Sequence, residues 1–186
     1  MRILGIAGSL RADSHNKRLL AAAARLLPED VEYVRFDGLK WIPPFDEDDE
    51  ERPGAAVDGW REAIASADGL LFATPEYNAS IPGQLKNAID WASRPAAKPV
   101  IRGKNAAVIG ASSSMFGAAW AQAELRKVLS TAGARVLDRD LPIPYALEAF
   151  DEHGRLADAE IEGRLEEIVG ELVEQARVSQ QFALSR

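Results

Sequence analysis

The chain has 186 residues, 47% of them hydrophobic and 27% charged, as in an ordinary globular protein, and its formal net charge is −7 at pH 7. This acidic balance argues against a nucleic-acid binder or a binder of anionic membranes, because both need a basic face. The absence of cysteine excludes disulfides, iron–sulfur ligation and a cysteine nucleophile, and two histidines are too few for a multi-histidine metal cluster. No stretch approaches the roughly 20 apolar residues of a membrane span, and no signal-peptide pattern is present, so we expect a cytoplasmic protein.

Short apolar runs alternate with helical patterns along the chain. The runs that predict strands are 2–7, 31–36, 69–74, 105–111 and 134–138. The patterns that predict helices are 16–27, 55–66, 82–94, 118–131 and a last helix from about 158. Such alternation is typical of a parallel α/β sheet. We therefore predict one domain over residues 1–186, a doubly wound three-layer α/β/α fold with five parallel strands in the order 2-1-3-4-5.

Two helix ends carry specific signals. Ser80 precedes the helix predicted from Pro82 and is a candidate N-cap, since proline is tolerated in a first helical turn. The tail after Val178 is polar, and we expect it to fray.

Three loops of unusual composition follow the first, third and fourth predicted strands. They are 8–16, 74–82 and 111–117. In the order 2-1-3-4-5 these strands are neighbours, and ligands of open α/β sheets bind beyond the carboxyl ends of the strands, where the order reverses. We therefore expect the three loops to converge on one ligand site.

The first loop has the composition of a phosphate site. Ser9, Ser14 and Asn16 can donate hydrogen bonds, Arg11 can add a charge-assisted one, and the following helix offers the positive end of its dipole. The alternative is a turn in which Ser14 or Asn16 only caps the helix, and His15 could either donate to the phosphate or face solvent. The patterns G-x-x-x-x-G-K-[ST] and G-x-G-x-x-G are absent, which argues against triphosphate hydrolysis and a permanently bound nicotinamide cofactor.

The other two loops can border a planar group. Loop 74–82 offers the ring of Tyr77 with backbone amides and small residues, and the alternative is a rigid proline-bounded turn. In loop 111–117, Met115 and Phe116 indicate contact with a ligand, a partner subunit or the core. The acidic run 46–51 could bind a divalent ion, but six adjacent like charges are more typical of a solvated loop, so no metal site is predicted.

Three segments closely resemble the NADPH-dependent FMN reductase family, which includes chromate, quinone and azo-dye reductases. They are GSLRADSHN (8–16), PEYNASIPGQLKNAIDWASRP (75–95) and GASSSMFGAAWAQ (110–122). The resemblance runs in order across residues 2–145. It implies a flavodoxin-like fold, FMN as the cofactor, and a homodimer or homotetramer with the flavin near the subunit interface. Relatives often carry an arginine where this chain has Trp120, which leaves the role of that position open.

The resemblance also implies roles for the residues that match the family motifs. Four would hold the FMN phosphate: Ser9, Arg11, Ser14 and Asn16. Five would line the isoalloxazine ring: Pro75, Glu76, Tyr77, Asn78 and Ser80. Two would flank its other side: Ser112 and Gly117.

The implied activity is that of an FMN-dependent NAD(P)H oxidoreductase with ping-pong turnover. NADPH or NADH would pass hydride to flavin N5 and leave, and a small-molecule acceptor (a quinone, azo compound, chromate or free flavin) would take its place. No side-chain acid or base is required, so no catalytic residue is predicted. Glu76 is the candidate for an acid, and a hydrogen bond within the loops is its simpler role. The alternative function is a non-enzymatic flavodoxin-type electron carrier, which the net charge permits.

Overall fold

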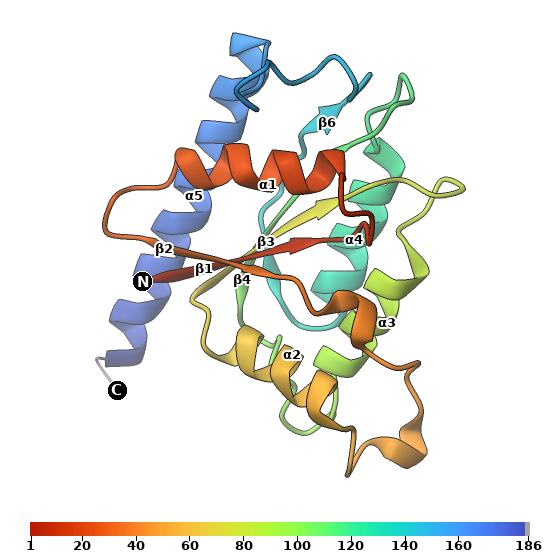
Figure 1. Ribbon diagram of the computed structural model, residues 1–186. Helices are drawn as coiled ribbons and strands as arrows, with labels where there is room; N and C mark the ends of the chain where they lie inside the picture. The colour runs from red at the N-terminus through yellow and green to blue at the C-terminus, as the bar shows by residue number, and fades with distance from the viewer. Residues whose placement is uncertain (185–186) are drawn as a thin grey trace.

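The computed structural model describes residues 1–184 and is built around a parallel sheet (Figure 1). Its strands are β1 (Arg2–Ala7), β2 (Glu32–Phe36), β3 (Gly69–Thr74), β4 (Asn105–Ala111), β5 (Arg135–Val136) and β6 (Pro142–Ile143). The order β2-β1-β3-β4-β5 confirms the predicted order. The described chain also has a sixth strand that the sequence did not indicate, because β6 pairs with the carboxyl end of β4 after the polar segment 138–140 has left the sheet.

Helices cover both faces of this sheet. One face is covered by α1 (His15–Arg25) and α5 (Ala159–Leu184), and the other by α2 (Ala55–Ala65), α3 (Gly83–Ala92) and α4 (Ala119–Thr131). Two 3₁₀ turns, η1 (Leu39–Trp41) and η2 (Glu47–Asp49), lie between β2 and α2. Each face of the sheet has its own apolar core, as a three-layer fold requires. Among residues 1–184, no helix combines the length and hydropathy that crossing a bilayer requires.

The two predictions on helix ends were wrong. Pro82 takes the N-cap position of α3, and Ser80 instead exchanges two backbone hydrogen bonds with Tyr77, of 2.9 and 3.1 Å. Residues 179–184 remain helical, because α5 continues to Leu184, and the last two residues of the predicted tail, 185 and 186, lie outside the described residues. The second half of α5 stays packed on the sheet, where Asn105 Nδ2 donates to Ser179 Oγ at 2.9 Å.

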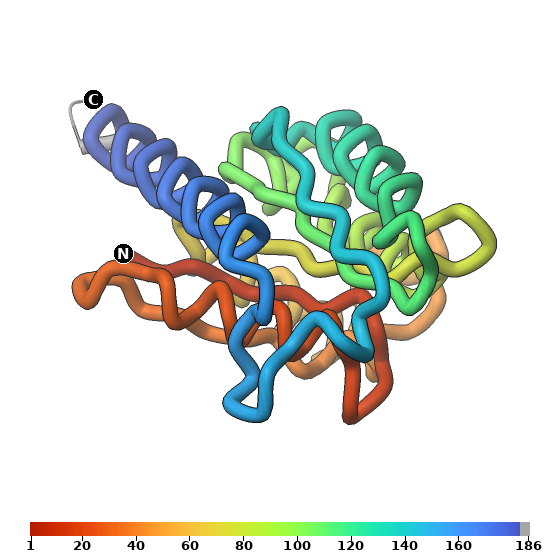
Figure 2. Tube along the Cα trace, turned by 90° about the horizontal axis from the view of Figure 1, so that it is seen from above, coloured from red at the N-terminus to blue at the C-terminus, as the bar shows by residue number. Residues whose placement is uncertain are grey.

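The start of β1 and the last turn of α5 lie on the opposite side of the molecule from the three loops. The N-terminus and the last turn of α5 both lie on the left of Figures 1 and 2, and the segments 8–14, 75–82 and 112–117 lie on the right. The carboxyl ends of β1, β3 and β4 therefore open onto a single edge, where ligands of such sheets bind.

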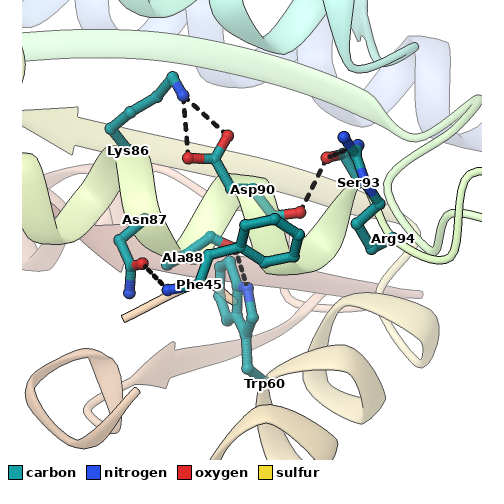
Figure 3. Close-up of polar contacts among 8 residues, drawn as sticks. All are labelled: Phe45, Trp60, Lys86, Asn87, Ala88, Asp90, Ser93 and Arg94. Atoms are coloured by element: carbon teal, nitrogen blue, oxygen red, sulfur yellow. Dashed lines mark hydrogen bonds and ion pairs between the residues drawn. The ribbon is translucent and has the colours of Figure 1, made fainter. Parts of the chain in front are cut away.

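Contacts from the loop after β2 hold α3 in place (Figure 3). Phe45 N donates to Asn87 Oδ1 at 2.7 Å, and the guanidinium of Arg94 lies 5.6 Å from the centroid of the Phe45 ring. From α2, Trp60 Nε1 donates to the carbonyl of Ala88 at 2.7 Å. Because α3 follows loop 75–82 directly, this packing fixes where that loop ends.

Candidate active site

The three loops meet around a cavity of about 120 Å³ beyond the carboxyl ends of β1, β3 and β4. The residues that line it are Ser9, Arg11, Ser14, His15, Asn16, Pro75, Glu76, Tyr77, Ala111, Ser112 and Ser113. The predicted convergence of the loops is therefore confirmed. The cavity brings together most of the predicted site residues, and the three that do not line it are Asn78, Ser80 and Gly117.

The loop after β1 keeps several hydrogen-bond donors available. Ser14 is the N-cap of α1, where its Oγ accepts from Asn16 N at 3.2 Å, so the capping alternative is realised. The hydroxyl proton of Ser14 remains free to donate. In the described part of the chain, the backbone N–H groups of Ser9 and Leu10 donate to no protein acceptor. The exposed guanidinium of Arg11 makes no hydrogen bond or ion pair with residues 1–184. These groups suit an anion at the positive end of α1.

The side chain of Asn16 joins two of the loops. It is only 2% exposed, its Nδ2 donates to the Ala111 carbonyl at 2.9 Å, and its Oδ1 accepts from Ala111 N at 3.0 Å. This pair of hydrogen bonds fastens the start of α1 to the end of β4. Asn16 is therefore first a positioning residue, and one Nδ2 proton remains for a ligand. The motif pointed to this residue but not to its partner, which lies 95 residues away.

Residues 77–80 form a tight turn at the edge of the cavity. Tyr77 and Ser80 close the turn, and its central residues Asn78 and Ala79 have φ angles of 54° and 59°. Two successive positive φ angles are typical of a type I′ turn, and this conformation costs an alanine about 1 kcal/mol. Such a turn presents the ring of Tyr77, 48% exposed, beside the cavity.

Glu76 caps α4 from a neighbouring loop. Its Oε2 accepts from Trp120 N and from Ala121 N, both at 3.1 Å. The N-cap residue of α4 itself, Ala118, makes no side-chain cap hydrogen bond. The carboxylate therefore satisfies two N–H groups of the first turn of α4 and complements the helix dipole. Glu76 thus has a hydrogen-bonding role, as in the simpler of the two roles considered, but its partners lie in the first turn of α4 and not within a loop.

Replacing Glu76 with alanine is expected to lower the free energy of unfolding by about 1–2 kcal/mol, because the start of α4 loses its cap. The change Glu76→Gln keeps a side-chain oxygen at the same place and should cost less. Urea unfolding measures both effects, and the pH profile of the activity measures any loss of proton transfer. A Glu76→Gln variant of normal stability whose turnover fell a hundredfold would contradict the capping role.

Arg11 supplies the positive charge of the cavity lining. Burial, and then the neighbouring Arg18 and Arg11, lower the pKa of His15 below its usual value, which favours the neutral imidazole. The Nδ1 atom of His15 is buried and has no hydrogen-bond partner among the described residues. Within residues 1–184, no group of acidic or histidine side chains is arranged to hold a metal ion.

Residues 1–148 match the family model described as NADPH-dependent FMN reductase. The chain belongs to this family. The reductase is 45% identical over 160 residues to an NAD(P)H-dependent FMN reductase of Pseudomonas aeruginosa, and the match covers 85% of each protein. It is 46% identical over 129 residues to a 2-hydroxy-1,4-benzoquinone reductase of a Burkholderia species, covering 69% of each.

A solved structure of a flavoenzyme shares the fold of the reductase. FerB of Paracoccus denitrificans, an NAD(P)H:(acceptor) oxidoreductase, superposes with a TM-score of 0.83 at 33% sequence identity, over 95% of this chain and 97% of that one. The predicted family, flavodoxin-like fold and oxidoreductase class are therefore confirmed, and the enzyme is favoured over the non-enzymatic electron carrier.

Proposed function

We propose that the reductase holds the phosphate of FMN in the cavity between its three loops. The observation that carries this proposal is the set of unused donors in the loop after β1: the guanidinium of Arg11, the hydroxyls of Ser9 and Ser14, and the amides of Ser9 and Leu10. A phosphate dianion needs several donors and a compensating charge, and these residues offer both. Asn16 contributes mainly by holding the loops together.

We assign the isoalloxazine ring to the surface beside the 77–80 turn. Pro75, Tyr77, Asn78 and Ser80 border it on one side, with Glu76 keeping that loop attached to α4. Ser112 and Gly117 border it on the other. The support is the convergence of these loops and the rigid turn that presents Tyr77.

FMN, when bound, supplies the two-electron hydride chemistry, and the protein supplies binding and orientation. NADPH or NADH and a small-molecule acceptor use the same open site in turn, which makes the turnover ping-pong. The acceptor class includes quinones, and free flavin, azo compounds and chromate belong to the same proposal. Quinones have the most direct support, because one relative is named as a benzoquinone reductase.

Anaerobic reduction of the purified yellow protein tests this function. Addition of NADPH or NADH is expected to bleach the visible flavin absorbance rapidly, and a quinone added afterwards is expected to restore it. Steady-state rates measured against nucleotide concentration, at several fixed quinone concentrations, should give parallel lines in double-reciprocal plots. Absence of bleaching by either nucleotide in a flavin-loaded protein would contradict the enzyme and favour the electron carrier.

We also propose that the reductase acts as a homodimer or homotetramer, as the family resemblance implies. One face that a second copy could cover is the groove of about 380 Å³ between α3 and α4. The residues that line it include the apolar Ile89, Pro99 and Val128 and the basic Arg102 and Lys127. Light scattering coupled to gel filtration measures the molar mass that distinguishes a dimer from a tetramer and from a monomer.

A further inference from the structure

An exposed aromatic pair lies at the start of α4. The rings of Phe116 and Trp120 contact each other with centroids 4.5 Å apart and an interplanar angle of 46°. Phe116 is 47% exposed and Trp120 is 49% exposed, so both rings face solvent as well as each other. Neither residue has a part in the phosphate and ring contacts assigned above. Large apolar groups left in contact with water often mark a binding surface.

The segment that carries this aromatic pair adjoins the cavity between the three loops. Trp120 N donates to Glu76 Oε2 at 3.1 Å, and Glu76 lines the cavity. Ser113, another lining residue, precedes Phe116 by three positions in the same loop. The pair is thus joined to the cavity through both of the loops that we assign to the isoalloxazine ring.

Two chain segments around the aromatic pair contain no charged residue, and the carboxylate of Glu76 contacts the backbone of one of them. The stretch 105–123, which contains both rings, has no Asp, Glu, Lys or Arg. The stretch 141–147, whose Tyr145 N donates to Ser114 O at 3.3 Å, has none either. The carboxylate of Glu76 accepts from two N–H groups of α4. These two stretches therefore contribute apolar contact and no positive charge, and the net charge of −7 disfavours the approach of anions.

We propose that Phe116 and Trp120 form the surface against which the electron acceptor docks, and that this surface selects uncharged planar acceptors over anionic ones. The inference rests on the proposed function, because it places the acceptor next to the FMN site. In the overall reaction a quinone gains two electrons and two protons and becomes a hydroquinone. NAD(P)H supplies the hydride equivalent, and solvent supplies the second proton.

The size of the exposed pair fits a small planar molecule better than a protein. The two half-exposed aromatic rings themselves offer on the order of 200 Å², with Met115 and Tyr145 also exposed on the segments next to them, whereas each partner in a stable protein complex buries roughly 800 Å². Stacking on aromatic rings is worth most to flat, weakly hydrated ligands such as quinones. An anion such as ferricyanide gains nothing from these rings and retains its repulsion from the acidic protein.

The variant Trp120→Ala tests the proposal with two acceptors, menadione as the neutral quinone and ferricyanide as the anion. With the holoprotein under saturating NADPH, we expect kcat/KM for menadione to fall about tenfold through a higher KM, and kcat/KM for ferricyanide to change less than twofold. The variant Trp120→Phe should keep most of the menadione activity. The variant Trp120→Lys should raise kcat/KM for ferricyanide and lower it for menadione.

Trp41 provides the matched control, because it is a tryptophan with 72% exposure on η1, outside the cavity lining. Trp41→Ala should leave both acceptors unchanged. Equal losses of kcat/KM for both acceptors in Trp120→Ala would overturn the proposal in favour of a structural role. A changed molar mass of this variant by light scattering would overturn it in favour of a second copy covering the pair. If NADPH bleaches wild-type flavin and Trp120→Ala keeps its menadione activity, this inference fails and the proposed function stands.

Discussion

Replacing Gly117 with alanine is expected to lower the free energy of unfolding by about 3 kcal/mol, from a strained φ and a backbone clash. The φ of Gly117 is +58°, and a Cβ there would lie 2.6 Å from Ile143 N and 2.7 Å from Ile143 C. These are backbone atoms of β6, so no side-chain rotation can relieve the contact. Either β6 or loop 112–117 must move, and Ser112, which donates from its backbone N to Ile143 O at 3.1 Å, must move with it. FMN content should fall as well.

Gly103→Ala is the control for this prediction. Gly103 has a φ of +76°, but a Cβ there would have no atom within 4 Å. Gly103→Ala should therefore lose only about 1 kcal/mol of unfolding free energy, from the strained φ, and should keep its FMN. Urea unfolding of the two flavin-free variants and flavin titration measure the difference. Equal losses of stability in the two variants would show that the contact with Ile143 does not constrain loop 112–117.

The arrangement of the sheet could be predicted because it depends on local patterns. Apolar runs separated by amphipathic helices specify a parallel sheet, and the carboxyl ends of neighbouring strands must then share an edge. β6 could not be predicted in this way, because only Pro142 and Ile143 pair with β4. Its position depends on distant contacts such as Leu141 N donating to Oε1 of the buried Gln122 at 2.9 Å.

The candidate site was predictable in its location but not in its internal contacts. The loop sequences indicated donors and an aromatic ring, and the structure brings them to one cavity. The capping of α4 by Glu76 and the attachment of Asn16 to Ala111 join residues 44 to 95 positions apart through backbone atoms. Every residue type offers the same backbone N–H and C=O groups (proline lacks the N–H), so a sequence motif does not indicate which backbone group a side chain contacts. Ser80 was misassigned for a related reason, since the left-handed Asn78 and Ala79 turn the chain before α3 begins.

Replacing Asn16 with alanine is expected to reduce both the stability of the protein and its affinity for FMN. Ala111 N and the Ala111 carbonyl are buried and would lose their side-chain partner, at a cost of about 3 kcal/mol in unfolding free energy. The start of α1 would also lose its attachment to β4, so the phosphate donors and the loop 112–117 would no longer be held together. We expect FMN affinity to fall about a hundredfold, which corresponds to about 2.7 kcal/mol.

Two controls separate these two effects. Asn105 is an equally buried asparagine at the opposite end of the sheet, where its Nδ2 donates to Gln175 O at 3.2 Å and to Ser179 Oγ. Asn105→Ala should lose stability and keep FMN affinity. Arg11→Ala should keep its stability and lose FMN affinity, because this exposed side chain has no hydrogen bond or ion pair within residues 1–184. Unfolding should be measured without flavin, since bound FMN stabilises the folded state itself.

The substitution Asn16→Asp adds a test with a defined pH dependence. A carboxylate can still accept from Ala111 N, but its second oxygen would face the Ala111 carbonyl, which Nδ2 now contacts. Burial and this repulsion raise the pKa of the introduced carboxyl in the folded state, whereas its protonated form can donate to the carbonyl. The stability it contributes is therefore present at low pH and lost as the pH rises through the raised pKa. Two results would show that the attachment of Asn16 to Ala111 does not organise the cofactor site. One is an Asn16→Asp variant that becomes less stable on acidification. The other is an Asn16→Ala variant that keeps its FMN affinity, as Asn105→Ala should.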